Sequence, residues 1–91
     1  MSNTFNQVCK LLNEEFSFHY DQIQLETKLE LELGMDSREM FELIDKVELL
    51  FKIIIDLDDI DKMMEDHIVL TIQDLVNYIN QKQQSMNEKL M

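Results

Sequence analysis

Residues 33–51 read LGMDSREMFELIDKVELLF and include Gly34, the only glycine in this chain of 91 residues. In the second part of this stretch, apolar residues recur at spacings of three and four, so they share one face of a helix. The residues of this apolar stripe are Met40, Phe41, Leu43, Ile44, Val47, Leu50 and Phe51. The pattern therefore predicts an amphipathic helix over about 37–52.

Two signals mark the start of this helix. Asp36 and Glu39 stand at the N-cap and N3 positions of a capping box, in which each side chain accepts a hydrogen bond from the other residue's backbone N–H. Met35 and Met40 occupy the positions of the hydrophobic staple that accompanies such a box. We therefore expect Ser37 to be the first residue of the helix.

Three further helices are predicted from the same kind of pattern. The first covers about 4–16, where one face carries Phe5, Val8, Leu11, Leu12 and Phe16. A short helix is expected over about 57–65. The last helix begins after Thr71, which stands as its N-cap, with Asp74 at N3.

The segments between these helices complete the expected fold. Residues 17–35 show no sustained helical period and predict a long loop, and such loops often have a function. Residues 53–55 are three isoleucines, which we interpret as a turn into the core because no partner strand is evident. One glycine and no proline argue against an all-β fold, because closely spaced strands need such turn residues. We expect an all-α four-helix bundle with a long loop between helices one and two and a short third helix.

The chain is long enough for one small domain and too short for two. We expect residues 1–83 to form this domain. The stretch from Gln81 onward is too polar to be buried, so residues 84–91 are expected to form a disordered C-terminal tail.

Charge and cysteine content narrow the class of protein. Lys and Arg number 8 against 19 Asp and Glu, a formal charge of −11, so nucleic acid or an anionic membrane surface would repel the chain. Cys9 is a single cysteine, which excludes an internal disulfide, and no zinc-binding spacing is present. Neither a secretory leader nor an apolar run of about 18 residues is evident. We expect a soluble, monomeric, cytoplasmic protein that binds neither nucleic acid nor membranes.

Catalytic and metal-binding patterns are missing from the sequence. His19 and His67 are not spaced as a metal pair, and neither a glycine-rich phosphate loop nor a nucleophile elbow occurs. The acidic run 56–61 fails as a calcium-binding loop, because Asp61 stands where that loop requires glycine. Acids at this place instead favour a helix start, through the helix dipole. We therefore predict that the protein is not an enzyme and holds no metal.

With catalytic and metal-binding patterns excluded, Ser37 remains as the candidate functional residue. A serine in the first turn presents its hydroxyl where unpaired backbone N–H groups and the helix dipole would favour an attached phosphate. No base is placed to activate the hydroxyl, so any modification would need another enzyme. The structural alternative is an ordinary serine at the start of a helix.

The segment from Leu33 to Ser37 resembles the prosthetic-group motif of acyl carrier proteins, in which the serine after Gly-x-Asp carries 4′-phosphopantetheine. The resemblance continues over about residues 5–55 and again over 72–79. It implies a bundle of the acyl-carrier type, with the cofactor attached to Ser37 and with Gly34 and Asp36 as parts of the motif. It also implies a phosphopantetheinyl transferase as a partner, which supplies the group from coenzyme A.

The resemblance also implies a docking surface for acyl-transfer or condensing enzymes that carry basic patches. Its acidic members would be Glu39, Glu42, Asp45 and Glu48 on the second helix. The family usually has leucine where this chain has Arg38 and an apolar residue where it has Asp45. We therefore expect these two residues to select partners. The family's proline near residue 56 is absent, and about six extra residues stand between 55 and 71.

The resemblance identifies the chain as a carrier of acyl intermediates, held as thioesters, for fatty acid, polyketide or related specialised lipid biosynthesis. Two alternatives stay open at this point. One is an acidic helical protein-interaction module without a prosthetic group. The other is a peptidyl or aminoacyl carrier.

The charge of the chain leads to a prediction about stability. Ten of the 19 acids lie between Ser37 and Asp66, so the folded chain should repel itself at neutral pH. Added salt or Mg²⁺ should screen this repulsion and raise the melting temperature, by roughly 4–8 °C for each 1 kcal/mol relieved. Thermal unfolding followed by circular dichroism measures the shift, and a melting temperature that does not respond to salt would contradict the prediction.

Overall fold

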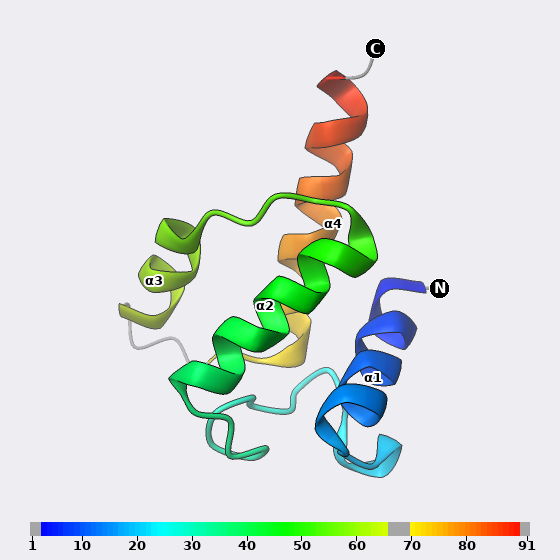
Figure 1. The fold of residues 1–91 in the computed structure, drawn as a ribbon, viewed down its shortest axis with the longest axis vertical. Helices are drawn as coiled ribbons and strands as arrows, with labels where there is room; N and C mark the ends of the chain where they lie inside the picture. Colours follow the sequence, from blue (N-terminus) through cyan, green and yellow to red (C-terminus); the bar gives the residue numbers. More distant parts are fainter. Residues whose placement is uncertain (1–2, 66–69, 90–91) are drawn as a thin grey trace.

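The computed structural model describes residues 3–65 and 70–89, and within them the fold is helical. The elements in chain order are α1 (Asn3–Phe16), the short 3₁₀ helix η1 (Tyr20–Gln22), α2 (Ser37–Phe51), α3 (Leu57–Glu65) and α4 (Ile72–Lys89). Figure 1 shows α2 crossing in front of α4, with α1 and α3 at opposite sides of the view. The predicted all-α fold, with a long loop between α1 and α2, is confirmed.

The helix boundaries follow the sequence signals closely. α2 begins at Ser37 and α3 covers residues 57–65, both as predicted. α2 ends one residue earlier than expected, because Lys52 takes the left-handed conformation with φ of 56°. The backbone N–H groups of Lys52 and Ile53 both turn back to the carbonyl of Glu48, which is the usual way to satisfy the last carbonyls of a helix.

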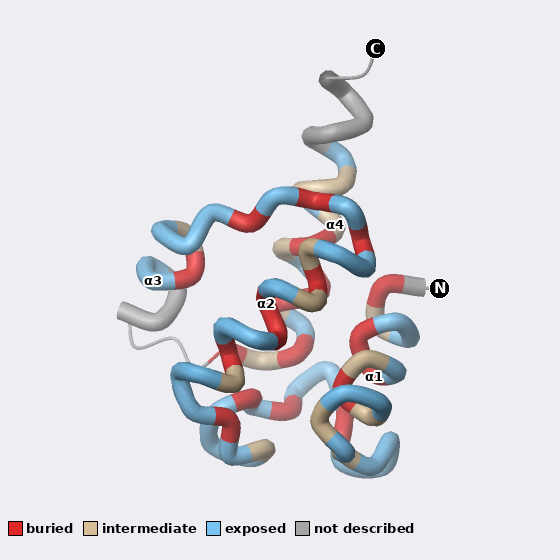
Figure 2. Tube along the Cα trace, in the orientation of Figure 1, coloured by how far each residue is buried: buried red, intermediate tan, exposed pale blue. Residues whose placement is uncertain are grey.

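The core draws residues from α1, α2, α3 and α4 and from the loop that joins α1 to α2; Figure 2 marks the buried residues in red. Its buried apolar residues are Val8, Cys9, Leu12, Ile23, Leu29, Met35, Met40, Leu43, Ile44, Val47, Phe51, Ile53, Ile55, Ile60, Leu70, Ile72, Leu75, Val76 and Ile79. Burial raises the pKa of the Cys9 thiol. Ile53 and Ile55 enter the core while Ile54 between them is 76% exposed, which agrees with a turn into the core.

The predicted apolar stripe of α2 is wider than the buried face of the helix. Phe41 and Leu50 belong to the stripe by spacing, yet they are 46% and 45% exposed. Successive residues of a helix are about 100° apart, which places these two side chains on opposite flanks of the buried residues. They therefore border the core and do not fill it.

The acidic run 56–61 forms the start of α3. The Asp56 side chain accepts a hydrogen bond from the Asp58 N–H at 2.9 Å, and the Asp56 carbonyl accepts one from the Asp59 N–H at 3.0 Å. The described residues bring no three metal-ligating side chains together. None of their helices has both the length and the apolar character that a bilayer span requires.

α4 continues further than the polar sequence of its second half suggested. The stretch from Gln81 onward is predicted to be too polar for burial, but Lys82 and Gln83 are half-buried and the helix runs to Lys89. Gln, Lys, Glu and Met are good helix formers, and neither glycine nor proline interrupts them. The predicted tail, residues 84–91, lies partly outside the described residues, and its disorder stays a prediction.

One polar cluster joins α3 to α4. The Tyr78 hydroxyl donates a hydrogen bond to Asp59 Oδ2 at 2.8 Å. Lys82 Nζ lies 3.6 Å from the same oxygen and 5.5 Å from the centre of the Tyr78 ring. Burial, together with the hydrogen bond to Asp59, raises the pKa of Tyr78 from 10.0 to about 12. We call Asp59, Tyr78 and Lys82 the α3–α4 tether.

The tether leads to a prediction about pH. Since folding raises the pKa of Tyr78, its hydrogen bond should stabilise the fold fully below pH 10 and lose this effect as the pH rises toward 12. Tyr78→Phe should therefore lower the free energy of unfolding by about 1 kcal/mol near neutral pH, and by less above pH 10. Urea unfolding across this range measures the difference.

Tyr20→Phe is the matched control, because Tyr20 is exposed and lies outside the tether. This variant should unfold like the wild type at every pH. A Tyr78→Phe variant as stable as the wild type at neutral pH would show that the tether does not stabilise the fold.

Candidate functional site

Ser37 lies at the first position of α2 with its side chain exposed. The Glu39 N–H donates to Asp36 Oδ1 at 2.9 Å, and the Asp36 N–H donates to Glu39 Oε1 at 3.4 Å. Met35 and Met40, on either side of this box, are both buried. The predicted capping box is confirmed, and it holds Ser37 at one defined place on the surface.

Gly34 sets the direction from which the chain enters α2. Its φ is +67°, in the left-handed region that residues with a side chain rarely adopt. No atom lies within 4 Å of the place that a Cβ would take, so the need for glycine is conformational and not a matter of space. Just before it, the Leu33 N–H donates to the Lys28 carbonyl at 3.3 Å.

Backbone hydrogen bonds fasten the long loop to the start of α4. The Leu29 N–H donates to the Leu70 carbonyl at 3.0 Å, and the Ile72 N–H donates to the Thr27 carbonyl at 2.9 Å. Thr71 lies at the centre of this pairing as one half of an isolated bridge. The sequence did not predict the pairing, because backbone hydrogen bonds leave no apolar period behind.

Side chains complete the attachment at both ends of this pairing. The Thr27 hydroxyl is buried, donates to the Gln22 carbonyl at 3.1 Å and accepts from the Gln24 N–H at 2.9 Å. Thr71 and Asp74 form the capping box predicted for α4, with bonds of 3.1 and 3.2 Å. The loop is therefore held firmly where it leads into Gly34 and Ser37.

Chemically, the site offers an exposed hydroxyl beside backbone donors. The Asp36 carbonyl accepts a hydrogen bond from the Met40 N–H, and the Asp36 side chain accepts one from the Glu39 N–H. The N–H groups of Ser37 and Arg38 lie in the first turn, where a helix has no internal acceptor. In the described part of the chain, no base is hydrogen-bonded to the Ser37 hydroxyl. The site can therefore present a hydroxyl and stabilise a nearby anion, and it contains nothing that would activate the hydroxyl itself.

The structure divides the five predicted docking residues into two groups. Arg38, Glu42 and Asp45 are exposed, and none of the ion pairs among the described residues includes them. Glu39 and Glu48 are half-buried.

Both half-buried acids have structural roles. Glu39 belongs to the capping box. Glu48 Oε2 accepts a hydrogen bond from the Ile55 N–H at 2.8 Å and so fixes the connection that follows α2. The exposed group is the more available for a partner.

Comparison with known proteins shows the family to which this chain belongs. No protein-family model matches the chain. The acyl carrier protein of Campylobacter jejuni (strain RM1221) is 35% identical over 77 residues, which is 85% of this chain and 92% of that protein. This chain belongs to the acyl carrier protein family.

Other organisms contribute further similar members of the family. The acyl carrier protein of Campylobacter lari is 33% identical over 79 residues, covering 87% of this chain and 95% of that protein. The acyl carrier protein of Cylindrotheca sp. (strain N1) is 32% identical over 85 residues, which is 90% of this chain and 95% of that protein. The similarity thus extends over most of each acyl carrier protein.

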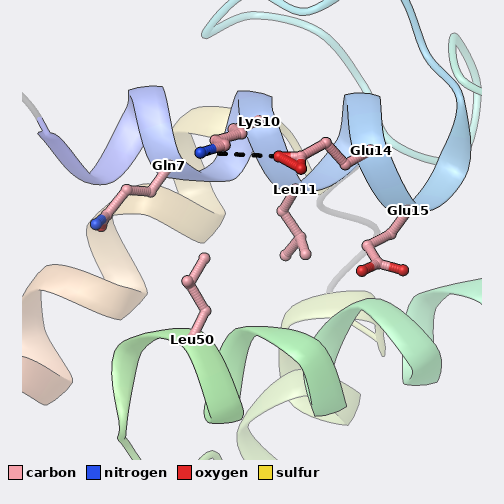
Figure 3. Close-up of a pocket in the computed structure, with 6 residues that line it drawn as sticks. All are labelled: Gln7, Lys10, Leu11, Glu14, Glu15 and Leu50. Carbon is pink, nitrogen blue, oxygen red and sulfur yellow. Dashed lines mark ion pairs between the residues drawn. The ribbon is translucent and has the colours of Figure 1, made fainter.

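In this acyl carrier protein a surface groove lies between α1 and α2, at the end of α2 away from Ser37. Leu11 of α1 and Leu50 of α2 point toward each other across it (Figure 3). Polar side chains form its rim: Gln7, Lys10, Glu14 and Glu15. Lys10 pairs with Glu14 at 3.9 Å, and Glu15 pairs with Lys46 of α2 at 3.2 Å. The partial exposure of Leu50 is explained by this groove.

Besides the pairing of the loop with α4, two features of α2 were missed at the level of sequence. One is the structural role of Glu48, which a lone acid near a helix end does not reveal. The other is Leu49, which is 80% exposed on α2. The sequence does contain a signal for the exposure of Leu49, because this residue stands on the side of the helix opposite the apolar stripe, where a polar residue is usual.

Proposed function

We propose that this protein carries acyl groups as thioesters on a 4′-phosphopantetheine arm attached to Ser37, and that it catalyses no reaction itself. The observation that carries the proposal is the exposed Ser37 at the start of α2, held behind Gly34 by the Asp36–Glu39 capping box, in a chain of the acyl carrier protein family. The cargo would serve fatty acid, polyketide or related specialised lipid biosynthesis, in the cytoplasm.

The residues of the site fit the attachment of such an arm. A phosphopantetheinyl transferase would provide the base that Ser37 lacks, and the serine oxygen would bond to phosphorus as the nucleotide part of coenzyme A leaves. The free N–H groups of the first turn and the helix dipole would then face the phosphodiester. When bound, the arm supplies the thiol that holds an acyl group as a reactive thioester.

The charge of the chain supports partners with basic surfaces. With a net charge of −11, long-range attraction would speed encounter with basic patches on acyl-transfer or condensing enzymes. Exposed charges such as Glu42 and Asp45 raise association rates more than they slow dissociation. A monomer that binds and leaves quickly suits a carrier that visits several enzymes.

Loading of Ser37 tests the proposal directly. Incubation of the apo protein with coenzyme A, Mg²⁺ and a broad-specificity phosphopantetheinyl transferase should add one phosphopantetheine, seen as a single mass increase of the intact protein. Ser37→Ala should stay folded, because its side chain is exposed, and should gain no mass. Ser85→Ala, a serine on α4, is the control and should load like the wild type.

The outcomes separate the candidate functions. Loading followed by acceptance of acyl groups supports the acyl carrier, whereas transfer of amino acids alone would assign a peptidyl or aminoacyl carrier. If several transferases fail to modify the wild type, the acidic interaction module without a prosthetic group becomes the better description.

Arg38 and Asp45 provide a test of partner choice. The two side chains are exposed, and an Arg38–Glu42 pair four residues apart would stabilise a helix by only a few tenths of a kcal/mol. Recognition is therefore the better reason for a charge where the family has an apolar residue. An exposed charge pair is worth up to about 1 kcal/mol, so losing or gaining one should change a partner preference roughly fivefold.

The variant Arg38→Leu with Asp45→Met should be used better by enzymes of general fatty acid synthesis and less well by the enzymes of its own organism. The measurement is kcat/KM for acyl transfer with each set. Lys52→Leu changes an exposed charge just past the end of α2 and serves as the control. Equal use of the double variant and the wild type by both sets would show that these two positions do not select partners.

A further inference from the structure

Leu49 is the most exposed large apolar side chain among the described residues, at 80%. A helix turns about 100° per residue, which puts Leu49 on the side of α2 opposite the buried residues. Its neighbour Leu50 turns toward Leu11 and the groove between α1 and α2 (Figure 3). Contacts within the chain therefore account for the position of Leu50 and leave Leu49 in solvent.

Leu49 shares its side of α2 with charged residues. Arg38, Glu42 and Asp45 precede it by 11, seven and four residues, which are close to whole numbers of helical turns. All three are exposed and stand outside the ion pairs of the described residues. We call Arg38, Glu42, Asp45 and Leu49 the outer face of α2: it is charged toward Ser37 and apolar at its far end.

We propose that Leu49 is the apolar anchor of this outer face and enters an apolar pocket on a partner enzyme whose basic side chains meet Glu42 and Asp45. The inference rests on the proposed function, because the partners in question act on a group attached to Ser37. Leu49 lies 12 residues from Ser37, or about 18 Å along the helix. The pocket for Leu49 is therefore separate from the opening through which the arm enters.

Charge complementarity favours a basic enzyme over a second copy of this chain. A symmetric dimer through the outer face would bring Glu42 and Asp45 of one copy toward the same acids of the other. Each copy also carries a net charge of −11. Like charges placed together at an interface are unfavourable, whereas a basic partner surface satisfies both acids at once.

The two ends of the outer face should contribute differently to binding. Glu42 and Asp45 act through long-range attraction, so they should set the association rate, and salt should weaken their effect. Leu49 acts by losing contact with water, which requires a formed complex, so it should set the dissociation rate and respond little to salt. Burying a leucine fully is worth more than 1 kcal/mol, which corresponds to roughly tenfold in affinity.

The experiment measures binding kinetics of the loaded protein to purified acyl-transfer and condensing enzymes of the same organism. Leu49→Gln should raise Kd roughly tenfold through faster dissociation, by the same factor at low and high salt. Leu49→Met, which keeps an apolar side chain, should bind like the wild type. Asp45→Asn should instead slow association, and more so at low salt.

Ile54→Gln is the matched control, because Ile54 is 76% exposed but lies in the connection after α2, outside the outer face. It should bind like the wild type. An equal loss of affinity with Leu49→Gln and Ile54→Gln would assign the effect to general surface hydrophobicity and overturn the proposal that Leu49 is an anchor. Sedimentation of the wild type should show a monomer, and a dimer that Leu49→Gln abolishes would assign the outer face to a second copy.

Loading of Ser37 in the same preparations separates this inference from the proposed function. A chain that the transferase does not load lacks the carrier role. A chain that is loaded, yet binds no tested enzyme or binds each of them equally well with Leu49→Gln, keeps the carrier role and overturns the anchor.

Discussion

The two reciprocal hydrogen bonds between Asp36 and Glu39 are the interaction on which the geometry of the candidate site at Ser37 depends. They stop the first turn of α2 from fraying, and a cap of this kind is worth about 1 kcal/mol. Without it, the first turn would fray more often, and the backbone donors beside Ser37 would share a common direction for less of the time. Gly34, in its left-handed conformation, lets the loop reach this turn while Met35 stays buried.

A second constraint holds the loop in place at some distance from the serine. Its backbone pairs with the start of α4 through Leu29 with Leu70 and Thr27 with Ile72. A loop of this length would otherwise be entropically costly, and Leu29, which is fully buried, would lack a fixed place in the core. The position of Ser37 therefore depends on segments that lie far apart in the chain: the loop, α2 and the first turn of α4.

The acids of α2 fall into two groups, which separate by their place on the helix. Glu39 and Glu48 satisfy backbone N–H groups at the beginning of the helix and just after its end, so they stabilise the fold. Glu42 and Asp45 are exposed and take part in none of the ion pairs among the described residues. A helix can thus be both acidic and stable, because part of its charge is used by its own ends and the rest is available to a partner.

The sequence by itself determined the all-α fold, the long loop before α2, the first residue of α2 and the position of Ser37 at the start of that helix. Capping boxes and apolar periods act between residues three or four apart, so a single stretch of sequence contains the whole signal. Only the tertiary structure decided the pairing of the loop with α4, the tether of Tyr78 to Asp59 across 19 residues, the contact of Lys82 with α3, and the exposure of Phe41 and Leu50. These features depend on which segments meet in space, and the identity of a residue and its neighbours along the chain does not contain that information.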